Sequence, residues 1–312
     1  MTNLFIIGNG FDLSHNLPTH YGNFREYLRT TYSYKFDEEP TRLANVTMDP
    51  SGKWIYDDES VHYLDSLISL ASDYETWADF ESSLGCLDYS IVDEYIQISL
   101  DRDGDEDNWH TTANYEDTYS ELINIVGQIK VLFKKWICSI PISHHSYHYP
   151  LNTVQSFQNI INPEEDIFLN FNYTTTLEYL YQVQNITHIH GCRDKNEELI
   201  IGHNNTTEYE EEPYQQDIYK NRMCNSLRKN VELCIKNNEV FFEMLKESDI
   251  DNIFSYGFSF ADVDLEYIQK IISLIDTNNT TWFFESYPGK KELTNYHNKL
   301  IKIEFNGTFD LF

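Results

Sequence analysis

Basic residues are scarce in this sequence. Its 312 residues include 22 Lys and Arg against 51 Asp and Glu, which gives a formal net charge of −29 at pH 7. This charge repels phosphate backbones and anionic lipid surfaces, so broad nucleic-acid binding or docking on a membrane is not expected. A site for one small anionic ligand remains compatible with it, because backbone N–H groups bind anions locally.

Cysteine and long apolar runs are also scarce. The five cysteines form no Cys-x-x-Cys pair and no Cys/His cluster with zinc spacing, so no metal site is expected. No secretion signal opens the chain and no run reaches the ~18 apolar residues of a membrane span, so a cytoplasmic protein is expected. Aromatic residues are abundant at 15%, which places the chain among folded globular proteins rather than disordered ones.

The first dozen residues carry the strongest local pattern. The run from Leu4 to Ile7 is apolar and rich in β-formers, and it ends abruptly at Gly8-Asn9-Gly10. One interpretation is a nucleotide phosphate held against the glycine backbone, with Asn9 or Asp12 reaching ribose hydroxyls. The other is a strand-exit turn that needs glycine for steric reasons, with Asp12 capping a helix. These residues alone leave both interpretations open.

From about residue 165 onward, short β-rich runs alternate with helical segments. The expected strands are 166–171, 186–190, 199–202, 252–256, 280–285 and 300–305, and the expected helices are 175–182, 214–246 and 264–275. This spacing predicts an α/β fold with a mostly parallel sheet flanked by helices, which the first strand joins. We therefore expect a nucleotide-binding core of residues 1–30 and 151–312, and a mainly helical insertion or cap at 31–150.

Three further strand-to-helix junctions carry polar residues, and in an open α/β sheet such junctions gather at the carboxyl ends of the strands. Asn172 could orient a water or a ribose hydroxyl, or it could cap the helix that follows. Alternation predicts His188 and His190 on one face of their strand, and His190, at the strand end, is the better candidate for a general base. A lone histidine is more often structural. Gly257 and Ser259 could line a second side of a phosphate pocket.

The chain carries an ordered set of motifs: Phe5-Ile6-Ile7-Gly8-Asn9-Gly10-Phe11-Asp12, a Leu-Pro-Thr loop, Trp77-x-Asp79-x-Glu81, Phe171-Asn172-Tyr173-Thr174-x-Thr176-Leu177-Glu178, His188-x-His190-Gly191, Ile201-Gly202-His203-Asn204 and Tyr256-Gly257-Phe258-Ser259. Taken together, these motifs resemble the bacteriophage abortive-infection AbiH family over nearly the whole chain. That family is in turn similar to the sirtuin-like (SIR2-like) Rossmann superfamily, in which the corresponding loops surround NAD.

The resemblance implies a Rossmann-like fold and a role for each matching residue. The implied catalytic residues are Asn172, which would hold the ribose or a water, His190 as the base, and Asp12, which with Glu81 would stabilise developing positive charge. The implied nucleotide-binding residues are Gly8 and Gly10 at the pyrophosphate, Gly257 and Ser259 at the far phosphate or ribose, and Asn9, Phe11 and Thr174 in the same loops.

The implied function is that of an anti-phage abortive-infection effector that hydrolyses NAD or a related nucleotide at the N-glycosidic bond. The alternative is a nucleotide-binding sensor or scaffold without turnover. Thr174 replaces an acidic residue of many SIR2-like proteins, Asn9 replaces a common alanine, and the zinc-binding cysteines of protein deacetylases are absent. The expected partners are a small nucleotide, a phage-derived trigger and further copies of the chain.

Overall fold

The computed structural model describes residues 2–33, 47–48, 50–52, 54–55, 58–72, 80–143, 151–195, 197–286 and 289–312. Trp77 and Asp79 of the motif quoted above lie outside these residues. The chain divides into two compact units. The first consists of Met1–His20, Ile137–Ile200 and Asn230–Phe312, and the second of Tyr21–Trp136 and Ile201–Lys229. The second unit thus includes 201–229 in addition to most of the expected insertion.

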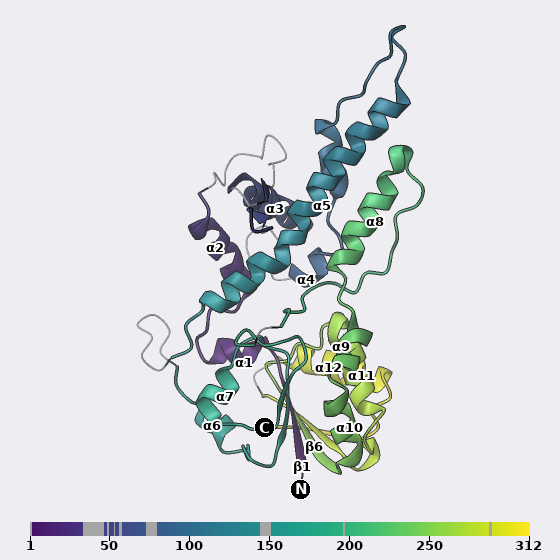
Figure 1. Cartoon of the computed structure of the whole chain (residues 1–312). Coiled ribbons are helices and arrows are strands. Elements are labelled where there is room, and N and C mark those ends of the chain that lie inside the picture. Colours follow the sequence, from purple (N-terminus) through teal and green to yellow (C-terminus); the bar gives the residue numbers. More distant parts are fainter. Residues whose placement is uncertain are drawn as a thin grey trace. The chain divides into compact units, whose positions relative to one another are not determined.

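The first unit is built on a six-stranded parallel sheet (Figure 1). Its strands are β1 (Thr2–Ile7), β4 (Ile167–Asn170), β5 (Ile186–His188), β6 (Ile250–Tyr256), β7 (Thr281–Phe284) and β8 (Thr308–Leu311), in the spatial order β5-β4-β1-β6-β7-β8. Counted along the chain, this order is 3-2-1-4-5-6, the order of a Rossmann dinucleotide-binding sheet. The predicted α/β, Rossmann-like fold is therefore confirmed.

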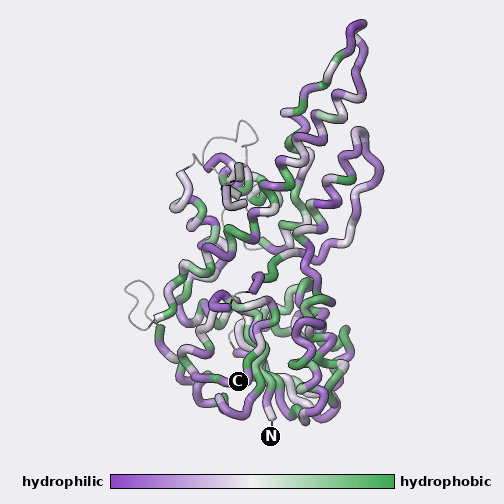
Figure 2. The backbone as a smooth tube through the Cα atoms, viewed as in Figure 1, coloured by the Kyte–Doolittle hydropathy of each residue, from purple (hydrophilic) through white to green (hydrophobic). Residues whose placement is uncertain are grey.

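Strand β1 lies at the centre of the sheet and is buried on both faces. Leu4, Phe5, Ile6 and Ile7 are all 0% exposed, as expected of a continuous apolar run inside a parallel sheet. Leu4 and Ile6 pack into one hydrophobic cluster, and Phe5 and Ile7 into the cluster on the opposite face. The hydrophobic segments of this unit accordingly gather in its strands (Figure 2).

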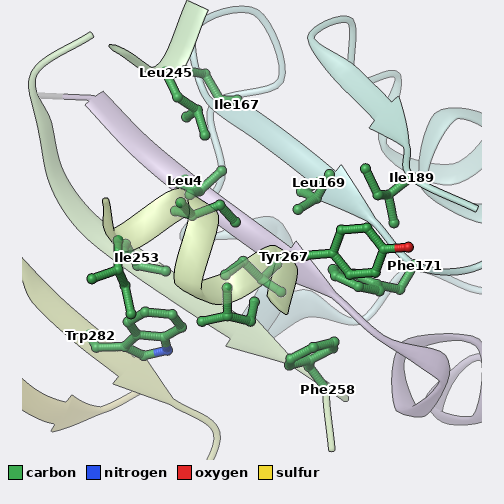
Figure 3. Close-up of a cluster of buried hydrophobic side chains, with 14 of the residues drawn as sticks. Leu4, Ile167, Leu169, Phe171, Ile189, Leu245, Ile253, Phe258, Tyr267 and Trp282 are labelled. Atoms are coloured by element: carbon green, nitrogen blue, oxygen red, sulfur yellow. The ribbon is translucent and has the colours of Figure 1, made fainter. Parts of the chain in front are cut away.

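Helices cover both faces of the sheet. One face carries α9 (Val231–Asn237), α10 (Glu239–Glu247), α11 (Leu265–Ile272) and α12 (Lys290–Lys302), which bury apolar side chains against Leu4 and Ile6 (Figure 3). The other face carries α1 (Asn9–Ser14), α6 (Gln155–Gln158) and α7 (Thr176–Tyr181), whose aromatic side chains share one hydrophobic cluster with Phe5. Two 3-10 turns, η3 (Asp262–Asp264) and η4 (Thr277–Asn279), lie in the loops around α11.

Two of the expected strands are wrong. Residues 199–202 form no strand, and 300–305 contain the end of α12 and the turn that follows it. Leu300 and Ile303 of this range continue the helical spacing of Tyr296, and all three pack against the core. The true last strand, β8, is only four residues long and largely exposed at the edge of the sheet, so it lacks the buried apolar run that marks the central strands.

The second unit is mainly helical. It contains α2 (Tyr21–Thr31), α3 (Asp58–Ala71), α4 (Phe80–Ser83), η1 (Tyr89–Tyr95), most of α5 (Asn108–Ser139), η2 (Pro213–Gln215), α8 (Gln216–Leu227) and the antiparallel pair β2 (Thr47–Met48) and β3 (Trp54–Ile55). Phe24, Phe80, Phe133 and Trp136 form its aromatic core. The helix expected at 214–246 is divided among α8, α9 and α10.

In the part of the chain that the structure describes, no helix has both the length and the apolar character needed to cross a membrane.

Candidate functional site

Three glycines lie backbone against backbone at the carboxyl ends of β1 and β6. Gly8 N donates a hydrogen bond to Tyr256 O and Gly10 N donates one to Gly257 O, both at 2.9 Å. A Cβ atom at Gly8 would lie 2.5 Å from Gly257 O, and one at Gly10 would lie 2.6 Å from Gly257 Cα. The Gly-x-Gly turn therefore has a structural cause of its own, and the predicted pyrophosphate contacts of these glycines stay predictions.

This glycine contact occupies the point where the strand order of the sheet reverses. In Rossmann sheets the ligand crevice opens at that switch point, here between β1 and β6. The carboxylate of Glu285, which follows β7, also accepts a hydrogen bond from Gly257 N at 2.5 Å. Other polar side chains of the predicted site lie instead toward β4 and β5.

Asp12 is a deeply buried acid next to this turn. It is 1% exposed, and its Oδ2 accepts a hydrogen bond of 2.6 Å from Thr174 Oγ1, which lies 3.0 Å from Thr176 Oγ1. Its other carboxyl oxygen is buried and has no hydrogen-bond partner among the described residues. The Gly8 position, not Asp12, is the N-cap of α1, so the helix-cap interpretation of Asp12 is excluded.

Burial sets the proton affinity of Asp12. Desolvation raises its pKa from 3.8 to about 6, although the hydroxyls of Thr174 and Thr176 and the positive charges of His188 and Arg193 lower it. A carboxyl group with a pKa near 6 exchanges protons close to neutral pH, as catalytic acids and bases do. Asp12 therefore changes between its protonated and ionised forms near neutral pH.

Asn172 ties the loop after β4 to the turn after β1. Its side-chain Nδ2 donates to Gly8 O at 3.0 Å, and its backbone N donates to Asn170 Oδ1 at 2.9 Å. The N-cap of α7 is Thr175, so Asn172 does not cap that helix. Asn172 and Thr174 both make hydrogen bonds to the segment that joins β1 and α1. Two of the predicted loops therefore meet at the carboxyl ends of the strands.

His188 joins the third loop to the same cluster. It is the last residue of β5, and pairing of β4 with β5 places it opposite Asn170. Its Nδ1 lies 2.9 Å from Asn172 O and its Nε2 lies 2.7 Å from Glu178 Oε1. The sequence prediction gave no role to Glu178, because only the register of β4 and β5 shows that the first turns of α7 reach the end of β5.

His190 lies beyond the end of β5, in a turn, so strand alternation does not extend to it. It is 3% exposed, and its ring centroid is 5.3 Å from those of Phe171 and Tyr267. Figure 3 shows these two aromatic rings next to each other, on the face of the sheet that α11 covers. His190 Nε2 is 3.6 Å from Asp264 Oδ1. An aromatic environment and a nearby carboxylate thus surround the predicted base.

The side chains of the other predicted residues make no hydrogen bond to the Asp12 carboxyl group among the described residues. The ring of Phe11 is 0% exposed within the aromatic core, and Asn9 Nδ2 donates to Thr19 O at 3.0 Å. Ser259 is exposed. Glu81 belongs to the second unit, where its Oε1 lies 3.2 Å from Lys229 Nζ.

Sequence reasoning also missed two polar residues beside this cluster, the buried His15 and the partly buried Arg193. His15 Nδ1 donates to Phe11 O at 2.6 Å, and Tyr181 donates its hydroxyl to His15 Nε2 at 2.7 Å, while burial lowers the pKa of His15. Arg193 donates to the backbone carbonyls of Ile137 and Ile140. The contacts of His15 with Tyr181 and of Arg193 with the end of α5 join residues far apart in the sequence, so no local motif predicts them. Within the described residues, no group of three or more His, Cys, Asp or Glu is arranged to hold a metal ion.

Comparison with known proteins gives one match. No curated protein and no solved structure matches the chain. A family model described as "Bacteriophage abortive infection AbiH" matches residues 4–286, a span that includes every loop of the site described above. Because this match covers most of the 312 residues, the chain belongs to the bacteriophage abortive infection AbiH family.

Proposed function

We propose that this protein is an abortive-infection effector that hydrolyses the N-glycosidic bond of NAD or a related nucleotide. Its family gives it a role in phage abortive infection. The observation that carries the enzymatic part is the state of Asp12, a buried carboxyl group with a pKa of about 6 and one oxygen that lacks a hydrogen-bond partner among the described residues.

The choice of a nucleotide rests on the fold and on the motifs. The 3-2-1-4-5-6 strand order is that of dinucleotide-binding sheets, and the cluster lies where their ligands bind, at the carboxyl ends of the strands. The similarity of the motifs to SIR2-like proteins points to NAD among nucleotides. Fold and motif similarity of this kind is an analogy, so substrate identity needs its own experiment.

The proposed reaction breaks the bond between ribose C1′ and the nicotinamide nitrogen. The bonding electron pair leaves with nicotinamide, and the ribose acquires oxocarbenium character. A water oxygen then bonds to C1′ and loses a proton, giving ADP-ribose, nicotinamide and one proton. The Asp12 carboxylate stabilises the developing positive charge, since an opposite charge in a buried site acts strongly.

Asn172 and His190 complete the proposed site. The Asn172 amide is held by Gly8 O through its nitrogen, and its oxygen orients the attacking water or a ribose hydroxyl. His190 accepts the proton from that water, and Asp264, 3.6 Å from its Nε2, stabilises the resulting imidazolium. A neighbouring carboxylate favours the charged form of a histidine base.

Replacing His190 by Gln is expected to slow NAD hydrolysis by about 10²-fold, the lower end of the usual contribution of a general base. The measurement is chromatographic quantification of nicotinamide and ADP-ribose, with purified protein and extract of phage-infected cells as the source of a trigger. His110→Gln is the matched control, because His110 is an exposed histidine paired with Asp107 in the second unit. Circular dichroism establishes that both variants fold.

Unchanged turnover in His190→Gln would remove this histidine from the mechanism. The sensor alternative predicts a different pattern, in which NAD or ADP-ribose raises the melting temperature but no product forms. If no nucleotide is bound and none is consumed in the presence of the infected-cell extract, the proposed function is rejected.

A further inference from the structure

His188 is held between two oxygen atoms that accept hydrogen bonds. Its Nδ1 lies 2.9 Å from the backbone carbonyl of Asn172 and its Nε2 lies 2.7 Å from Glu178 Oε1. A neutral imidazole has one N–H and one lone pair, so it can donate to only one of these oxygens. With a carbonyl on one side and a carboxylate on the other, a second proton must lie between His188 and Glu178.

The surroundings favour placing that proton on the histidine. The Glu178 side chain is 28% exposed, whereas the His188 side chain is 2% exposed. Glu178 Oε2 is buried without a hydrogen-bond partner among the described residues, so its negative charge has to be balanced by a positive charge nearby. An imidazolium provides that charge and makes two charge-assisted hydrogen bonds.

We propose that Glu178 keeps His188 doubly protonated and that His188 thereby acts as a positioning residue, whose charge stabilises the Asp12 carboxylate and whose Nδ1–H fixes the Asn172 loop. Its catalytic consequence rests on the function proposed above. The protonation state of His188 does not rest on that function, since it follows from the two contacts of the imidazole ring. The proposal assigns to the His188–Glu178 pair a role that the motif resemblance did not include.

Among the described residues, two hydroxyl groups and two positive groups act on the Asp12 carboxylate. Thr174 donates to its Oδ2, the Thr176 hydroxyl is close to the Thr174 hydroxyl, and the positive groups are His188 and Arg193. Arg193 also donates to the carbonyls at the end of α5, and its Nε lies 3.4 Å from Asp194 Oδ1. The charge of His188 can therefore be removed by one conservative substitution at its partner Glu178, which leaves Arg193 in place.

Glu178→Gln tests this role because it keeps the size of the side chain and its ability to hydrogen-bond, but it removes the charge that holds the second proton on His188. The measurements are 15N spectra of histidine-labelled protein and the 13C titration of the Asp12 carboxyl, both on the full chain. His188→Gln and Asp12→Asn spectra assign the two signals. We expect both ring nitrogens of His188 to be protonated at pH 7 in the wild-type protein.

In Glu178→Gln we expect one ring nitrogen to lose its proton and the titration midpoint of Asp12 to move to higher pH. Glu266→Gln is the matched control, because Glu266 is an exposed carboxylate on α11 of the same unit and should change neither signal. A purely structural hydrogen bond would leave the Asp12 midpoint unchanged, and that outcome would overturn the proposal.

If Glu178→Gln fails to fold, the 15N spectrum of the wild-type protein alone still tests whether His188 is doubly protonated. One unprotonated ring nitrogen on His188 at pH 7 would contradict the proposal directly. These readouts need no turnover, so they separate this inference from the proposed function. The expected spectra without any NAD hydrolysis would reject the enzyme assignment and leave the His188 assignment standing.

Discussion

Replacing Asp12 by Asn is expected to raise the free energy of unfolding at pH 7 by about 1–3 kcal/mol while it reduces NAD hydrolysis by about 10³-fold. The gain in stability arises because Asp12 is 1% exposed and has one carboxyl oxygen without a hydrogen-bond partner in the described chain. Asparagine has nearly the same shape, is never ionised, and can still accept the hydrogen bond of Thr174. Function and stability are thus expected to change in opposite directions, as at many catalytic sites.

The pH dependence gives the sign of this effect. The pKa of Asp12 is raised in the folded state from 3.8 to about 6, so the folded protein binds a proton that the unfolded chain does not. The stability associated with that proton is fully present below pH 3.8 and is lost as the pH rises to about 6. We therefore expect the advantage of Asp12→Asn to be absent near pH 4 and complete above pH 6.

Amide hydrogen exchange of β1 and β6 measures this difference within the first unit, even if the two units unfold separately. Asp262→Asn is the control, because the Asp262 side chain is 75% exposed and pairs with Lys299 on the surface. Such a pair contributes about 0–1 kcal/mol, so the control should change stability little. A lower free energy of unfolding for Asp12→Asn at pH 7 would show that burial of the ionised Asp12 carboxylate does not destabilise the folded protein.

Replacing Gly257 by Ala is expected to destabilise the first unit by more than about 3 kcal/mol and to reduce the yield of folded protein. Its backbone has a φ of +62°, in the left-handed region that favours glycine. A Cβ there would lie 2.3 Å from Phe11 N and 2.5 Å from Gly10 C, and neither backbone atom can move without displacing the turn after the central strand. The contact joins two backbone segments at the carboxyl ends of the central strands β1 and β6, so rotating a side chain cannot relieve it.

Urea unfolding followed by circular dichroism measures this effect. Gly127→Ala is the matched control, because Gly127 lies within α5 and a Cβ there would meet no atom within 4 Å. Alanine is the better helix former by about 1 kcal/mol, so the control should be neutral or more stable. A Gly257→Ala protein with wild-type stability would mean that the loops after β1 and β6 do not touch.

Much of the fold could be predicted from apolar periodicity. The central strand β1 and the strand β4 contain fully buried runs, and β6 and β7 mix buried with partly buried residues. Such apolar runs bounded by turn residues are distinctive in a sequence. The edge strand β8 could not be found in this way, because Thr308–Leu311 alternates polar and apolar residues over only four positions and is mostly exposed. The inclusion of 201–229 in the second unit depends on contacts between distant segments, which periodicity does not report.

The sequence prediction named several residues of the candidate site, but it missed Glu178, His15 and Arg193 and the contacts within the cluster. Strand-to-helix junctions identified Asp12, Asn172 and the two histidines, because polar residues at strand ends are unusual enough to stand out. The pairing of His188 with Glu178 depends on the register of β4 and β5, which sequence alone does not specify. The close approach of Gly257 to Gly10 likewise requires the two loops to be seen together.

The central claim is that Asp12 supports nucleotide hydrolysis, and NAD turnover by the wild-type protein and by Asp12→Asn between pH 5 and 8 tests it most directly. We predict that infected-cell extract activates the wild-type protein to form nicotinamide and ADP-ribose, at a rate that rises as Asp12 ionises near pH 6. We also predict that folded Asp12→Asn forms about 10³-fold less product at every pH. Equal turnover by the two proteins, or a rate without dependence on pH through this range, would contradict the claim.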